Sequence, residues 1–151
     1  MKLAEALIER SDLQKRLALL EGRLKRSSRV QEGDEPPESP RYLLTELDVL
    51  SKSLEDLIRR INRTNVLTAI NRESLADLIV RRDGIAKKKG ILLNVIESAS
   101  ITPERYSQAE VRYLNTISVP DLQKQFDALA REYRLLDTQI QRQNWITELL
   151  E

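Results

Sequence analysis

The side chains that could do chemistry in this 151-residue chain are carboxylates, lysines and tyrosines, because the sequence contains neither histidine nor cysteine. That absence excludes disulfides, thiol nucleophiles, Cys/His zinc sites and serine–histidine triads. Acid–base catalysis by Asp, Glu, Lys or Tyr alone stays open, but nothing fixes Glu97, Glu104 and Glu110 at a catalytic separation. The sequence also lacks a glycine-rich phosphate loop, a nucleophile elbow and a metal-binding helix motif. We therefore expect a protein that is not an enzyme and uses no cofactor or metal.

Three cations occupy positions where an apolar period predicts leucine, namely Arg10, Arg82 and Lys89. Burying an unpaired cation is very costly, so each should meet a carboxylate, reach solvent or face a channel or interface. One hypothesis is a polar layer that sets helix register or binds a ligand, and the other is snorkelling at the edge of the apolar stripe. The basic run 87–89 lacks the aromatic residues that stack on bases, so we expect a solvated helix face and no nucleic-acid partner.

A polar and aromatic cluster near the end of the chain surrounds the only tryptophan, Trp145. Such a cluster is typical of a hydrogen-bonded layer or of an interface anchor, and a cap on the end of a helical bundle is the alternative. The candidate functional residues are the polar side chains of the expected helices and of this cluster: Arg10, Asn62, Asn65, Arg82, Lys89, Asp137, Gln141, Asn144 and Trp145.

Four helical segments must position these side chains. In each, apolar residues recur at alternating three- and four-residue steps, which we call a seam. The first two segments are residues 3–26 and 40–64, and Asn62 and Asn65 are expected to end the second. The third starts after a turn at Asn71 or Ser74 and runs to about residue 99, and the fourth runs from residue 118 to the chain end. The pattern predicts an all-α fold: one domain over residues 1–151, built as a bundle of about four long antiparallel helices.

Two segments interrupt the helices. Residues 30–41 form an acidic, proline-rich loop, expected to be a solvated connection between antiparallel helices or an acidic site for a cation or partner. Residues 100–119 form an irregular insertion before the last helix. There, alternating apolar residues at 111–117 predict a short extended segment or a small β-hairpin with residues 101–106, and a long ordered loop is the alternative. Ser118 and Pro120 then predict the start of the last helix.

Apolar residues that lie off the seams predict self-association, because long helical hairpins expose a second stripe that is often an oligomer contact. They are Leu7, Ile8, Leu19, Tyr42, Leu44 and Trp145. A formal net charge of +1 favours neither nucleic acid nor an anionic membrane. Charges at Glu5 and Glu9 are incompatible with a signal peptide, and no apolar run approaches the ~20 residues of a membrane span. We therefore expect a cytoplasmic homo-oligomer.

The sequence also resembles the septicolysin-like family of small bacterial helical proteins. The matching segments are residues 2–7, 10–14, 30–36, 61–65 and 136–145. The turn at 66–74 departs from the family pattern because it lacks a glycine. The resemblance implies a small helical protein with no catalytic residues to transfer. Our hypothesis is a non-enzymatic structural or interaction protein. The alternative is the activity in the family name, a cytolysin or pore-forming toxin acting on membranes, which requires apolar surface that can later be exposed.

Overall fold

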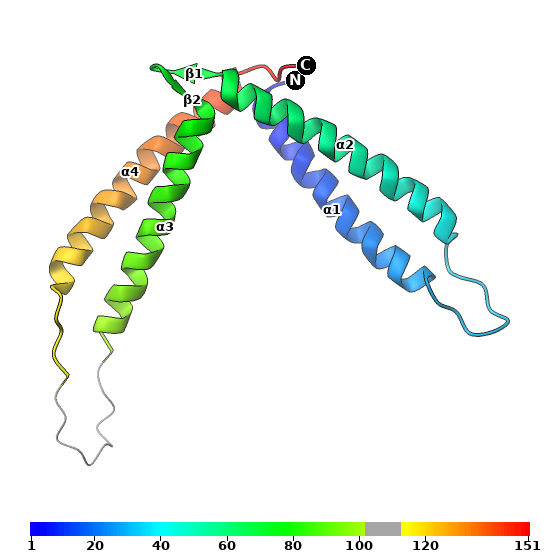
Figure 1. Ribbon diagram of the computed structural model, residues 1–151, viewed down its shortest axis with the longest axis horizontal. Helices are drawn as coiled ribbons and strands as arrows, with labels where there is room; N and C mark the ends of the chain where they lie inside the picture. Colours follow the sequence, from blue (N-terminus) through cyan, green and yellow to red (C-terminus); the bar gives the residue numbers. More distant parts are fainter. Residues whose placement is uncertain (102–112) are drawn as a thin grey trace, which may run out of the picture. The chain divides into compact units, whose positions relative to one another are not determined.

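The computed structural model describes residues 1–101 and 113–151, and it is an all-α fold with four long helices and one small β-hairpin (Figure 1). The elements are α1 (Leu3–Ser27), α2 (Pro40–Leu67), β1 (Ala69–Ile70), β2 (Glu73–Ser74), α3 (Leu75–Ala99) and α4 (Val119–Ile146). The chain divides into two compact units: unit 1 is Met1–Ala76 with Gln141–Glu151, and unit 2 is Asp77–Ile140. The all-α class with long antiparallel helices is confirmed, whereas one domain over the whole chain stays a prediction.

Unit 1 is built on the hairpin of α1 and α2, which pack along their lengths (Figure 1). Every seventh residue of each helix is buried at this contact, as the seam requires. These deep positions are Ala6, Leu13, Leu20 and Ser27 on α1, and Leu43, Leu50, Leu57 and Thr64 on α2. Local signals start both helices: the Lys2 amide donates to Glu5 Oε2 (2.7 Å), and Ser39 precedes Pro40 and caps α2.

Unit 2 contains most of α3 and α4, which run side by side (Figure 1). Its buried apolar residues are Leu78 and Ile85 on α3, and Leu136 and Ile140 on α4. The predicted start of α4 is confirmed, because Ser118 Oγ accepts a hydrogen bond from the Asp121 amide (3.3 Å) and Pro120 lies in the first turn.

The two-stranded hairpin lies between α2 and α3, with Ala69 opposite Ser74 and Ile70 opposite Glu73. Its two turn residues, Asn71 and Arg72, have φ of 51° and 73°, the left-handed pair that a tight hairpin needs. The hairpin expected in residues 100–119 falls largely outside the described residues, and no strand occurs at 100–101 or 113–118.

Two predicted helix ends are wrong. Helix α2 continues past Asn62 and Asn65 to Leu67, where the Thr68 amide donates to the Thr64 carbonyl (2.9 Å). Helix α4 ends at Ile146 rather than at the chain end, so the five residues 147–151 form an extended tail. Helix α4 ends early because the tail bonds to distant segments, whereas α2 continues to Leu67 through helical hydrogen bonds of its own.

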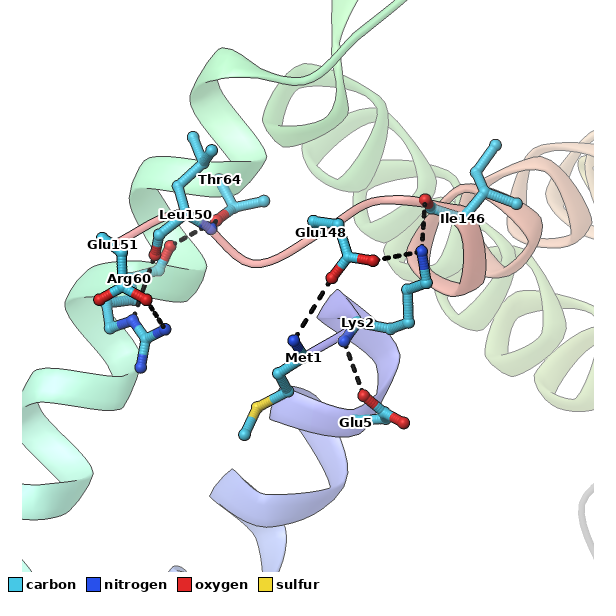
Figure 2. Close-up of polar contacts among 9 residues, drawn as sticks. All are labelled: Met1, Lys2, Glu5, Arg60, Thr64, Ile146, Glu148, Leu150 and Glu151. Carbon is cyan, nitrogen blue, oxygen red and sulfur yellow. Dashed lines mark hydrogen bonds and ion pairs between the residues drawn. The ribbon is translucent and has the colours of Figure 1, made fainter.

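The tail binds α1 on one side and α2 on the other (Figure 2). Toward α1, Leu3 donates to the Thr147 carbonyl and Leu149 to the Met1 carbonyl (both 2.9 Å), while Lys2 Nζ pairs with Glu148 at 2.5 Å. Toward α2, the Leu150 amide donates to Thr64 Oγ1 (3.0 Å). The tail therefore joins the first turn of α1 to the last turns of α2.

Candidate functional site

A groove in unit 1 collects three of the predicted site residues. The end of α4 lies against the outer flank of α1, and between them is a hollow of about 400 Å³. Helix α1 contributes Ala4, Leu7, Ile8, Ser11, Asp12 and Lys15, and α4 contributes Gln141, Asn144 and Trp145. The structure thus brings Trp145 together with Leu7 and Ile8, which the sequence marked as apolar residues off the seams.

Asn144 and Trp145 differ in exposure within this groove. Trp145 is 57% exposed, so it does not close the end of a core as the alternative required. Asn144 is 4% exposed, and its Oδ1 has no hydrogen-bond partner among the described residues. An unpaired buried acceptor costs about 1–3 kcal/mol. The groove is therefore amphipathic, with an apolar wall and one unsatisfied amide.

Arg82 and Asp137 form the polar layer of unit 2. Arg82 Nη1 donates to Asp137 Oδ1 (3.0 Å), and its Nη2 donates to Asp83 Oδ1 (2.8 Å). Burial of the guanidinium lowers the pKa of Arg82, but the hydrogen bonds to Asp83 and Asp137 outweigh it, so the pKa is raised overall. A seam cation that meets two carboxylates links α3 to α4 and remains charged.

Lys89 meets aromatic rings. Its Nζ lies 4.9 Å from the ring centre of Tyr133 and 5.6 Å from that of Phe126. Both distances fall in the range of cation–π attraction, which is worth roughly 0.5–1 kcal/mol where solvent reaches the pair. Arg82 and Lys89 thus both bind α4, through different chemistry, and neither points to a ligand.

The remaining predicted residues do not join these groups. Asn62 is exposed on α2 and Asn65 is half-buried one turn later. Arg10 is half-buried on α1, and its Nε is buried without a hydrogen-bond partner among the described residues. The nine residues therefore do not form one site.

Sequence reasoning missed the ion pairs that fix the acidic loop. Arg23 on α1 donates to Glu38 at 2.6 and 3.0 Å and to Glu46 on α2 at 3.2 Å. The hydrogen bond from Arg23 lowers the pKa of Glu38 below its ordinary value. Glu38 therefore has a structural partner that neither interpretation of the acidic loop includes.

The largest feature that the sequence did not reveal is one face of the α1–α2 hairpin, which we call the open face. Its residues follow the same three- and four-residue steps as the deep positions but lie on one side of them. They are Arg10, Gln14, Leu17, Glu21 and Leu24 on α1, and Leu44, Leu47, Ser51, Leu54 and Ile58 on α2. None of them is buried: Leu44 is 52% exposed, and Leu17, Leu47, Leu54 and Ile58 are half-buried.

In the part of the chain that the structure describes, no group of three or more Asp or Glu side chains is placed to hold a metal ion. Across residues 1–101 and 113–151, no helix has the length and apolar character needed to cross a bilayer.

Comparisons with known proteins place the chain among relatives that have no assigned role. Residues 10–149 match the model of a family described as "Family of unknown function (DUF6847)". The structure is also similar to the crystal structure of a functionally unknown conserved protein from Corynebacterium diphtheriae. That protein is 42% identical, with a TM-score of 0.93 and 99% of each chain covered. No curated protein matches the sequence. The septicolysin-like resemblance stays a prediction.

Proposed function

The chain belongs to the family of unknown function that its residues 10–149 match, and we propose that it is a non-enzymatic interaction protein that assembles with copies of itself. The observation that supports this role is the open face. A lone two-helix hairpin buries only one stripe of each helix, so a second apolar stripe beside the first calls for further helices. Five leucines and an isoleucine are left exposed or half-buried on it for this reason: Leu17, Leu24, Leu44, Leu47, Leu54 and Ile58.

The chemistry of the grouped polar residues agrees with a structural role. Arg82 is satisfied by Asp83 and Asp137, and Lys89 by two aromatic rings. Such groups set the register of packed helices, because a cation at a seam position stabilises only the pairing that brings it to its partner. The groove beside Trp145 is a second apolar surface on the same unit and offers a contact for a protein partner.

The test is the solution mass by light scattering across a range of concentrations. We expect a defined oligomer. Leu44→Asp on the open face should lower the mass, because a charge placed in an apolar contact is costly. Val49→Asp is the matched control, since Val49 is 60% exposed, as Leu44 is 52% exposed, but lies on another side of α2. Circular dichroism should show both variants to be as helical as the parent.

A monomer at all concentrations would refute self-assembly. That result would favour the cytolysin alternative. The test of this alternative is the release of dye from liposomes by the purified protein. No contact in the described residues favours that alternative specifically. Leakage at protein concentrations where the mass shows an unchanged soluble oligomer would contradict a purely structural role.

A further inference from the structure

We propose that the open face is the interface of a symmetric dimer, with a two-fold axis that crosses α1 at Leu17 and α2 at Ser51. The inference rests on the proposed function, because it names the surface and the symmetry of the self-association. In an isologous contact the same patch is used by both copies, so the patch must be complementary to itself after a half-turn. Four observations on the open face support such a contact.

The first is the residue pattern on α2. Ser51 is small, and apolar residues stand at nearly equal steps on each side of it: Leu47 and Leu44 before, Leu54 and Ile58 after. A half-turn about Ser51 lays Leu44 of one copy beside Ile58 of the other, and Leu47 beside Leu54. A small residue at the axis lets the two helices approach closely, while the flanking leucines interlock.

The second is that one axis fits both helices. An axis that lies in the face must cross α1 and α2 at the same level. Leu17 and Ser51 meet this requirement, because both line one shallow hollow of about 320 Å³ between the two helices. Arg23 of α1 contacts Glu46 of α2 farther along the hairpin, in keeping with the same antiparallel alignment.

The third is charge. On α1, Arg10 lies on one side of Leu17 and Glu21 on the other. Within one chain these two side chains are roughly 16 Å apart along the helix and cannot pair. The half-turn brings Arg10 of one copy to within about 5 Å, along the helix axis, of Glu21 of the other, which an arginine side chain can span. Arg10 has no ion pair among the described residues, and its buried Nε has no partner. In the part of the chain that the structure describes, Glu21 pairs only with Lys25, on the surface.

The fourth is area. Helix α1 has 25 residues and α2 has 28. With the axis at Leu17, α1 overlaps its own copy over residues 7–27, about 30 Å, and a face roughly 20 Å wide then covers about 600 Å² on each copy, or about 1,200 Å² in total. Stable specific interfaces bury roughly 1,200–2,000 Å². The contact therefore reaches the lower end of that range when the parts of the hairpin that flank the open face also take part.

Cysteine cross-linking tests the axis directly. The sequence has no cysteine, so an introduced thiol has no internal competitor. At a two-fold axis a residue faces its own copy, and helices packed about 8–10 Å apart bring facing Cα atoms near the ~4.4–6.8 Å that a disulfide needs. Ser51→Cys should give a covalent dimer under mild oxidation. Ser53→Cys, exposed on another side of α2, is the control and should remain a monomer on a non-reducing gel.

A charge swap tests the Arg10–Glu21 pair. Arg10→Glu and Glu21→Arg should each weaken dimerisation by about tenfold, because each places like charges together across the interface. The double variant should restore the dissociation constant to within about threefold of the parent. Since the two residues cannot meet within one chain, such a rescue reports contact between copies.

The outcomes separate the two proposals. A wild-type protein that is monomeric at every concentration overturns both, and the open face then belongs to a different partner. An oligomer in which Ser51→Cys does not cross-link, or cross-links no faster than Ser53→Cys, overturns the symmetric dimer and leaves self-assembly intact. Failure of the double charge variant to recover would likewise overturn the pairing across the axis.

Discussion

The hydroxyl of Thr64 binds the C-terminal tail to α2 through a hydrogen bond (Figure 2). Removing this hydroxyl tests how much the tail stabilises unit 1. Thr64 is 0% exposed. Its Oγ1 donates to the Arg60 carbonyl (2.7 Å) and accepts from the Leu150 amide (3.0 Å). Thr64→Val keeps the shape of the side chain but leaves that amide without its acceptor.

The expected magnitude follows from this loss. A partly buried amide that loses its only acceptor costs about 1–3 kcal/mol, and the carbonyl of Arg60 keeps its bond within the helix. We expect Thr64→Val to lower the free energy of unfolding by about 1.5 kcal/mol. For a chain of this size the loss corresponds to a fall of roughly 3–6 °C in Tm.

The assay is urea unfolding followed by circular dichroism, with all proteins at one concentration because oligomers gain apparent stability by mass action. Thr45→Val is the matched control. Thr45 Oγ1 makes the same bond within α2, to the Arg41 carbonyl (3.1 Å), but is exposed and binds no tail residue. It should change the free energy of unfolding by less than about 0.5 kcal/mol. Equal effects of the two variants would refute the assigned role of the tail.

Two further predictions concern the turn and the surface carboxylates. Arg72, at φ of 73°, carries the ~1–2 kcal/mol cost of a left-handed residue, so Arg72→Gly should raise the free energy of unfolding by about 0.5–1 kcal/mol after the backbone entropy of glycine is deducted. Arg72→Ala keeps the left-handed cost and should give no gain. Equal free energies of unfolding for the two variants would contradict this reasoning. A hydrogen bond from Arg23 lowers the pKa of Glu38, and one from Lys2 lowers the pKa of Glu148. The stability that these pairs provide is therefore present above the ordinary pKa of 4.5 and is lost as the pH falls through the lowered pKa values. Unfolding measured in acid should therefore show a smaller decline for Glu38→Gln than for the parent, and parallel declines would count against the Arg23 pair.

The sequence by itself determined the helices and the apolar seams that run along them. Leu43, Leu50 and Leu57 recur at the period that α2 buries, and Ser118 with Pro120 marks the start of α4 from neighbouring residues alone. The spacing of Gln141, Asn144 and Trp145 also placed them on one side of α4, because three- and four-residue steps share a helix face. These are local properties, so the chain reveals them without its fold.

The β-hairpin at 69–74 was too short to detect. Strands of two residues show no alternation, so the sequence predicts only a turn at Asn71 or Ser74 before the third helix, and the structure places Asn71, with its left-handed φ, in the turn of the hairpin. The missing glycine at this turn was visible in the sequence. Its consequence, a strained Arg72, needed the backbone.

Only the tertiary structure determined which apolar residues of the seams are buried and which remain exposed. Leu150 continues the apolar period of α4, but its amide binds Thr64 on α2, far away in the sequence, so the helix ends at Ile146. In the same way, Leu50 and Leu54 look equivalent as seam leucines, yet Leu50 is buried and Leu54 lies on the open face. The sequence specifies which residues are apolar and how often they recur. The direction from which the neighbouring helix approaches decides which of them are buried and which remain for a partner.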